Sequence, residues 1–189
     1  QIVQRLGLAA EYKDNETGLH VIRMSHYSRV LALAAGFSES AAEELLNAAP
    51  MHDVGKIGIP DAILTKPGAL TEDERKVMNY HARIGYEILH DEQRSPLTDL
   101  AAEIAISHHE RWDGSGYPNG LKGEEIPLSG RIVALCDVYD ALRSPRSYKQ
   151  AWSAERAQAY ILDNAGGHFD PHLVQVMSSV FTELEDLQL

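Results

Sequence analysis

The sequence predicts an all-α fold, and two observations carry that prediction. Apolar residues recur at spacings of three and four along nearly every segment, as they do on the buried face of a helix. The strict alternation of apolar and polar residues that marks a half-buried strand is almost absent. With 189 residues and 44% hydrophobic composition, the chain can bury its own core. We therefore expect one domain over 1–189, a bundle of about seven helices.

Two helices are expected at the N-terminal end, over about 2–12 and about 17–35. The second should stop at Gly36, because glycine takes the left-handed conformation that often follows the last turn of a helix. Ser40 with Glu43 forms a candidate capping box for a third helix, in which a serine side chain and a glutamate side chain satisfy the first free amides.

Pro50 should bend this third helix near its end. The segment 57–70 contains two glycines and two prolines, and we expect an ordered loop there. Thr71 and Glu74 form another candidate capping box, which opens a helix reaching about Leu89.

The second half of the chain contains a long irregular stretch between predicted helices. The stretch 112–130 holds five glycines and two prolines, and long loops inside compact domains are often functional. One helix should follow Pro96 and run toward His108. Three more are expected over about 130–142, 154–165 and 171–187, with Ser129, Ser153 and Asp170 as their respective caps.

Composition excludes several classes of function. The net charge of −11, from 28 acidic and 17 basic residues, argues against a broad surface for duplex nucleic acid. No apolar run approaches the roughly 20 residues of a membrane span. A single cysteine, Cys136, excludes an internal disulfide and favours a cytoplasmic location. The chain starts at Gln1 and not at methionine, so we expect it to be cut from a longer protein.

The doublet His52-Asp53 is the strongest local signal for chemistry. It places a neutral nitrogen ligand beside an anionic oxygen ligand, and a carboxylate at this position can bridge two metal ions. Lys56 follows three residues later and can offer positive charge to a phosphate. Taken alone, such a doublet is more often a helix-capping aspartate beside a partly buried histidine than a metal site.

Other candidate ligands lie on predicted helices. Glu16 and His20 are four residues apart and share a face if the helix already includes Glu16. The simpler alternative for Glu16 is an acidic residue in the first turn, stabilised by the helix dipole. His81 alone is more often a structural histidine than a ligand.

Two adjacent histidines, His108 and His109, end a predicted helix just before the irregular stretch. Asp137 lies among apolar neighbours, where an unpaired carboxylate would be costly, so metal ligation or ion pairing is expected. Asp140, one turn later, either supports it or faces solvent. The combination of imidazole and carboxylate without thiolate suits iron, manganese or nickel better than a closed structural zinc site.

Together these motifs resemble the HD-GYP family, a branch of the HD phosphohydrolase superfamily, over residues from about 12 to 175. The motifs that carry the resemblance are Glu16-x-x-x-His20, His52-Asp53-x-Gly55-Lys56, His81, His108-His109-Glu110, Asp113-Gly114-x-Gly116-Tyr117-Pro118 and Asp137. The resemblance implies an HD-domain helical bundle with a long loop that contains Gly-Tyr-Pro. It also implies hydrolysis of cyclic di-GMP to linear pGpG, and often on to GMP.

The resemblance further implies a centre of two or three divalent ions, most often iron or manganese, with nickel or zinc as alternatives. The implied ligands of two ions are His52, Asp53, His81, His108, His109 and Asp137, with Asp53 as the bridge. His20 would join them, and Glu16 would help to hold a third ion. Lys56 would contact the scissile phosphate, and Arg146 and Lys149 would grip the nucleotide. Ser147 stands where family members usually have proline, which leaves substrate preference open.

Several partners follow from the resemblance as expectations. Residues 1–15 would form a linker or signalling helix after an upstream sensory or receiver domain, and this helix could also pair two chains in a homodimer. The Gly-Tyr-Pro loop would either shape the pocket wall or dock a diguanylate cyclase domain. Two alternatives to the enzyme remain: a catalytically weak nucleotide-binding signalling module, and a relative that prefers pGpG or cyclic GMP-AMP.

Overall fold

A computed structural model describes residues 2–14, 18–93, 95–146 and 149–187. These residues form eleven α-helices and three short 3-10 helices, and no β-strand occurs among them. The all-α prediction is confirmed. No helix in the described ranges is long and apolar enough to cross a membrane.

The helices up to the middle of the chain are mostly short. They are α1 (Ile2–Lys13), α2 (Gly18–Ala34), α3 (Glu39–Ala48), the 3-10 helices η1 (Ala49–Met51) and η2 (Val54–Gly58), α4 (Asp61–Leu64), α5 (Glu72–Asn79) and α6 (His81–Leu89). The remainder are α7 (Pro96–Ser107), the 3-10 helix η3 (Gly123–Glu125), α8 (Leu128–Arg143), α9 (Ala154–Asp163), α10 (Pro171–Ser178) and α11 (Phe181–Glu185).

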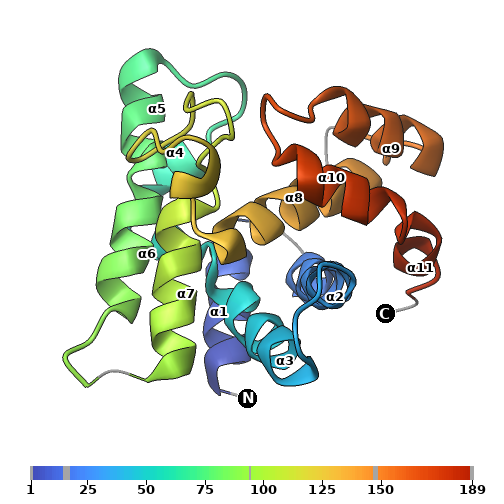
Figure 1. Cartoon of the computed structure of the whole chain (residues 1–189). Coiled ribbons are helices and arrows are strands. Elements are labelled where there is room, and N and C mark those ends of the chain that lie inside the picture. Colours follow the sequence, from blue (N-terminus) through green and yellow to red (C-terminus); the bar gives the residue numbers. More distant parts are fainter. Residues whose placement is uncertain (1, 15–17, 94, 147–148, 188–189) are drawn as a thin grey trace.

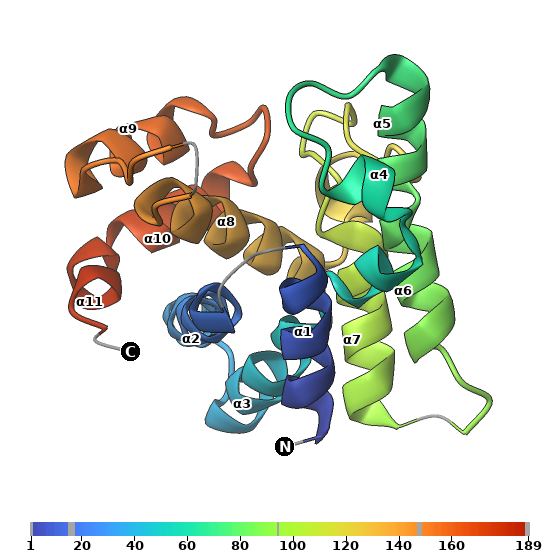
Figure 2. The same cartoon turned by 180° about the vertical axis from the view of Figure 1, so that it is seen from behind.

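The helices α2 and α8 form the centre of the arrangement. They pack against each other, and α2 also contacts α3, α10 and α11 while α8 contacts α7 and α9. The long pair of α6 and α7 stands beside them, with α5 continuing beyond α6 (Figure 1). Seen from the opposite side, α1 lies between this pair and α3 (Figure 2), and it packs against η1 and η2. Fully buried apolar side chains such as Leu31, Leu45, Ile104 and Leu135 fill the space between these helices.

Several predicted helix ends are confirmed. Gly36 has a φ of +97° just beyond α2, as expected for a glycine that ends a helix. Thr71 and Glu74 form the predicted capping box at the start of α5. The side chains of Ser153 and Asp170 accept hydrogen bonds from the first amides of α9 and α10, respectively.

Two predicted caps were each wrong by two residues. The cap of α3 is Ser38, whose hydroxyl accepts a hydrogen bond from the amide of Ala41, so Ser40 lies inside the helix. Ser129 is also inside its helix, because α8 begins at Leu128. The Ser129 hydroxyl instead donates a 2.6 Å hydrogen bond to the Glu103 carboxylate on α7. The hydroxyl of Ser129 thus bonds to a residue of another helix, a contact that the local sequence pattern does not show.

Three predicted segments divide into shorter elements, which is why the helices outnumber the expected seven. The helix expected over 71–89 breaks at Tyr80, whose amide bonds to the carbonyl three residues back and so ends α5. The final helix breaks at residues 179–180 between α10 and α11. The expected loop over 57–70 contains the end of η2 and all of α4. Pro50 does mark the predicted bend, because α3 gives way there to η1.

Candidate metal centre

The predicted ligands converge from five parts of the chain. His52 and Asp53 lie between η1 and η2, His81 is the first residue of α6, and His108 and His109 follow the last residue of α7. Two others stand inside long helices, His20 in α2 and Asp137 in α8. The break at Tyr80, which divides α5 from α6, is what places His81 at a helix end facing the doublet.

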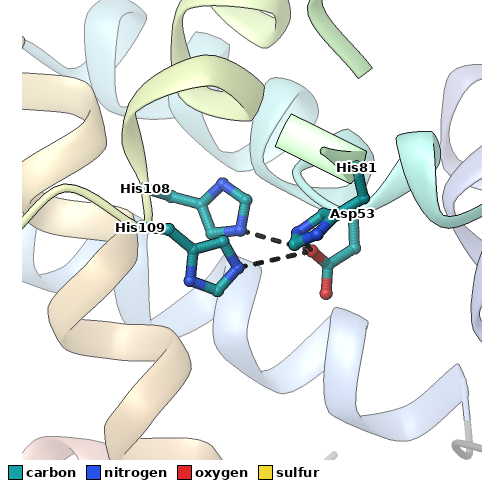
Figure 3. Close-up of side chains that lie close together, drawn as sticks. All are labelled: Asp53, His81, His108 and His109. Atoms are coloured by element: carbon teal, nitrogen blue, oxygen red, sulfur yellow. Dashed lines mark ion pairs between the residues drawn. The ribbon is translucent and has the colours of Figure 1, made fainter. Parts of the chain in front are cut away.

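Asp53 is the centre of the first cluster. Its Oδ1 atom lies 3.2 Å from the Nε2 atom of His81 and 3.3 Å from that of His108. The Nε2 atom of His109 is 4.0 Å from the same oxygen. Figure 3 shows these three imidazoles turned toward one carboxylate. Four ligand atoms within 4.8 Å of one another are sufficient in number and spacing to hold a metal ion.

A second cluster consists of His20, His52 and Asp137. Asp137 Oδ1 lies 3.0 Å from His20 Nε2 and 3.6 Å from His52 Nε2. His52 Nε2 is also 3.3 Å from Asp53 Oδ2, so the two oxygens of Asp53 face different clusters. This arrangement allows one carboxylate to bridge two ions.

The hydrogen bonds of the imidazoles show that the site suits metal ions. His52, His81 and His108 each place Nδ1 against a main-chain carbonyl oxygen, at 3.0, 2.7 and 3.0 Å. A carbonyl only accepts, so Nδ1 carries a hydrogen and Nε2 is the ring nitrogen left to face the ligand cluster. Those three Nε2 atoms and Asp53 Oδ1 are buried and form no hydrogen bond with the described residues. A bound cation would give these buried nitrogen and oxygen atoms the partner that they lack within the described ranges.

The electrostatics of the clusters also favour a cation. Burial would raise the pKa of Asp53, but the positive charge of Lys56 outweighs it and holds that pKa well below its usual range. Burial would likewise raise the pKa of Asp137, but the hydrogen bond with His20 outweighs it and holds that pKa well below its usual range. Burial and neighbouring histidines lower the pKa of His109, which keeps it neutral. Burial lowers the pKa of His20 and of His52, but the carboxylates that face them outweigh it, raising the pKa of His20 to about 10 and that of His52 above its ordinary value. A bound cation would therefore displace a proton from each of these two rings, because a metal binds the deprotonated nitrogen.

Lys56 lies at the edge of the first cluster. Its Nζ atom is 3.0 Å from Asp53 Oδ2 and 2.6 Å from Asp14 Oδ2. Burial would lower the pKa of Lys56, but the two carboxylates raise it well above its ordinary value, so the amine is charged. The lysine is therefore in place to meet an anion beside the clusters.

The loop that contains Gly-Tyr-Pro forms a wall next to His109. The ring of Tyr117 stacks on the His109 imidazole, with centroids 4.8 Å apart and an angle of 17° between the planes. The buried carboxylate of Glu110 holds the loop, accepting hydrogen bonds from the amides of Asn119 and Leu121 at 2.7 and 3.0 Å. Gly116 is required here, because a Cβ atom on it would lie 2.5 Å from the His109 carbonyl oxygen.

The remaining motif residues lie farther out along this loop. Asp113 is exposed, and its carboxylate accepts hydrogen bonds from the amide and hydroxyl of Ser115. Gly114 has a φ of +84°, a conformation that favours glycine. Tyr117 and Pro118 are joined by a cis peptide bond.

The predicted substrate residues lie beyond the end of α8. Arg146 and Lys149 pair their backbones in a short antiparallel bridge, with N–H to O distances of 2.8 and 3.0 Å. The amine of Lys149 lies over the ring of Trp152, 4.7 Å from its centroid. Ser147 and Glu16 fall outside the described residues.

Three residues near the clusters, Glu11, Asp14 and Arg23, were not predicted as part of the site, and the sequence leaves two alternatives for a fourth, Asp140. Glu11 lies in the last turn of α1 and Asp14 directly follows that helix. The buried Glu11 groups with His52 and Asp53 in a third set of ligand atoms within 4.8 Å of one another. The other two are Arg23 on α2 and Asp140 on α8, whose burial excludes the alternative that it faces solvent. Arg23 follows His20 by three residues, and Asp140 follows Asp137 by three. This helical spacing places each of them on the same face as a candidate ligand, and it was the signal available in the sequence.

Comparison with known proteins identifies the family. A model of the HD domain family matches residues 6–173, which is most of the chain. The chain is 48% identical over 187 residues to the cyclic di-GMP phosphodiesterase response regulator RpfG of Xanthomonas campestris pv. campestris (strain 8004), covering 99% of this chain and 49% of that protein. It is also 48% identical over 177 residues to the 3'3'-cGAMP-specific phosphodiesterase 2 of Vibrio cholerae serotype O1 (strain ATCC 39315 / El Tor Inaba N16961), covering 94% of this chain and 34% of that protein.

The fold has a solved counterpart as well. The crystal structure of a cyclic GMP-AMP specific phosphodiesterase from V. cholerae aligns with a TM-score of 0.69 at 20% sequence identity, covering all of this chain and 53% of that one. The chain thus spans between about a third and about a half of the length of these relatives. It belongs to the HD domain family, within the HD-GYP branch that its motifs resemble.

Proposed function

We propose that this domain binds two divalent metal ions and hydrolyses cyclic di-GMP to linear pGpG, with GMP as the further product. The observation that carries the proposal is the pair of ligand clusters joined through the two oxygens of Asp53. An HD domain binds divalent metal, and the donor set of imidazole and carboxylate favours iron or manganese, with nickel and zinc as alternatives. Glu16 remains the candidate for helping to hold a third ion.

Bound metal would supply a hydroxide at neutral pH and neutralise charge that develops on the phosphate. Three histidines and Asp53 would hold one ion, and His20, His52 and Asp137 the other. Lys56 would bind a non-bridging oxygen of the scissile phosphate or stabilise the leaving oxygen, since its amine is charged and adjacent to Asp53. The stacked Tyr117 would keep His109 oriented and limit the access of water on that side.

The choice of nucleotide needs a direct comparison. Relatives named for cyclic di-GMP and for 3'3'-cGAMP are equally similar to this chain, at 48% identity. Arg146 and Lys149 are proposed to grip the nucleotide, and their segment is the place where substrate preference would be set. A preference for cyclic GMP-AMP or pGpG is therefore the second candidate function.

The deciding experiment is anaerobic reconstitution with iron or manganese, followed by metal analysis and chromatography of products from all three nucleotides. The test variant is His108→Ala/His109→Ala, and the matched control is His172→Ala, which removes an exposed histidine far along the chain from the clusters. We expect two or more ions per chain and hydrolysis in the parent and the control, and neither in the test variant. If the parent protein binds metal and nucleotide but does not hydrolyse the nucleotide, the enzyme proposal is wrong and the domain is a nucleotide-binding signalling module.

The partner expectations are proposals of the same kind. A receiver or sensory domain would connect through α1, and a diguanylate cyclase domain would dock on the Gly-Tyr-Pro loop. Leu6 and Tyr12 on α1 are exposed, so self-association through this helix is also proposed. Light scattering with and without α1 tests it, and a monomer in both cases would refute it.

A cytoplasmic location stays a prediction from the single cysteine.

A further inference from the structure

A fully buried carboxylate lies just outside the ligand clusters. Asp140, on α8, has no solvent exposure, and it follows the ligand candidate Asp137 by three residues. Both of its oxygens are engaged: Oδ1 accepts a 2.6 Å hydrogen bond from Arg23 Nε, and Oδ2 contacts His20 Nδ1, a terminal nitrogen of Arg23 and the hydroxyl of Ser144. A buried charge is tolerated only with such a complete set of partners.

His20 depends on Asp140 for its orientation. The other buried imidazoles give their Nδ1 hydrogen to a main-chain carbonyl, whereas His20 gives it to this carboxylate. With Nδ1 held in this way, Nε2 is directed at Asp137 Oδ1, 3.0 Å away in the second cluster. A negative acceptor makes the opposite ring nitrogen a stronger ligand than a neutral carbonyl does.

Arg23 extends the network in the other direction. Its Nη2 atom donates a 2.6 Å hydrogen bond to the hydroxyl of Ser144, the first residue after α8. Two residues later comes Arg146, whose backbone pairs with that of Lys149. One guanidinium group therefore contacts both the carboxylate behind His20 and the start of the segment that carries the proposed substrate residues.

We propose that Asp140 and Arg23 are positioning residues that couple the metal ligand His20 to the 144–149 segment. Asp140 sets the basicity and direction of the His20 ligand. Arg23 keeps Asp140 in place and anchors the start of the segment at Ser144. The inference rests on the proposed function: its first half needs only the proposed metal binding, and its second half needs the proposed hydrolysis as well.

The test compares Asp140→Asn and Arg23→Gln with Arg29→Gln. Arg29 is on the same helix and forms an exposed ion pair with Glu39, so this control removes an arginine–carboxylate pair outside the network. The first readout is a competition titration of Mn²⁺ and Zn²⁺ with a chelator. We expect Asp140→Asn and Arg23→Gln to weaken the binding of one ion by about 10- to 100-fold, and Arg29→Gln to bind as the parent does.

The second readout separates KM from kcat for cyclic di-GMP at saturating metal. Arg23→Gln should raise KM at least several-fold, because Ser144 loses its anchor, whereas Asp140→Asn should mainly lower the metal affinity. Because each single variant removes one partner of an ion pair that includes the buried Asp140 carboxylate, Arg23→Gln/Asp140→Asn is prepared as well. In this double variant no unpaired charge remains, and the same metal defect is expected in a folded protein.

Unchanged metal affinity in the single and double variants, with a lower melting temperature only, would overturn the proposal and leave the network a purely structural one. An unchanged KM in Arg23→Gln would overturn the link to the 144–149 segment. Failure of the parent protein to hydrolyse any nucleotide would refute the proposed function, yet the metal titration would still decide the role of Asp140.

Discussion

The amine of Lys56 lies 2.6 Å from the carboxylate of Asp14, although the two residues are 42 positions apart in the chain. Asp53 contacts the same amine from the other side at 3.0 Å. The carboxylate of Asp14, just after α1, therefore occupies the amine of Lys56. In the proposed mechanism, this amine binds the phosphate of the substrate. An incoming phosphate must compete with Asp14 for that lysine.

Replacement of Asp14 by asparagine should therefore strengthen the interaction of Lys56 with substrate. We expect kcat/KM for cyclic di-GMP to rise by up to about fivefold, which corresponds to roughly 1 kcal/mol for a partly exposed ion pair. Steady-state kinetics of Asp14→Asn measures the effect. The control is Asp61→Asn, which removes an exposed carboxylate that lies 3.7 Å from the amine of Lys13, the residue before Asp14. A fall in kcat/KM would show that Asp14 orients Lys56 for catalysis and does not compete with the phosphate.

Glu110 should hold the Gly-Tyr-Pro loop in place. In Glu110→Ala, two amides lose a buried acceptor, at a cost of about 1–3 kcal/mol for each group left unsatisfied. We expect faster cleavage by protease within residues 111–125 and a lower urea midpoint. Glu124→Ala removes an exposed carboxylate from the same loop and should behave as the parent does. Equal cleavage rates in both variants would contradict this role.

Gly55 allows the doublet segment to approach α6 closely. A Cβ atom on Gly55 would lie 1.9 Å from the His81 carbonyl oxygen and 2.4 Å from the Gly85 nitrogen, both backbone atoms. In Gly55→Ala the segment must move away, so we expect a loss of about 3 kcal/mol in the free energy of unfolding together with reduced metal content. Gly167→Ala, whose Cβ would meet nothing closer than 3.9 Å, should change stability by less than about 0.5 kcal/mol. Denaturant unfolding and metal analysis check both, and an undisturbed Gly55→Ala would contradict the close approach.

His168 should make stability depend on pH on the acid side. Burial lowers its pKa to about 4, and the charge of Arg111 acts in the same direction, whereas an unfolded chain would titrate near 6.5. The stabilisation is thus complete above about pH 6.5 and is lost as the pH falls through 4, because the unfolded state takes up the proton first. The loss is at most about 3 kcal/mol and smaller if solvent reaches the ring.

Denaturant unfolding of chelator-treated protein between pH 7 and pH 4 measures this dependence. His168→Gln should show a shallower decline than the parent, and His172→Gln, which replaces an exposed histidine, should follow the parent. Identical curves for His168→Gln and the parent would exclude the buried neutral imidazole.

Local sequence patterns predicted those parts of the fold that local interactions decide. Helical spacing of apolar residues placed α1, α2, α7, α8 and α9 to within a few residues, and Gly36, Thr71 and Asp170 marked helix ends by their own backbone or side-chain chemistry. The breaks at Tyr80 and at residues 179–180 lie within continuous helical patterns. The spacing of apolar residues does not show where a backbone amide bonds to the carbonyl three residues back, and not four, so that the helix ends.

The sequence by itself also determined which residues were candidates for the site, because histidines and aspartates combined in these motifs are typical of a metal centre. Only the tertiary structure decided how they divide into two clusters that share Asp53, that Asp140 is buried behind His20, and that Asp14 reaches Lys56. The physical reason is that ion pairing and desolvation depend on distances between segments up to 120 residues apart. No local spacing records those distances.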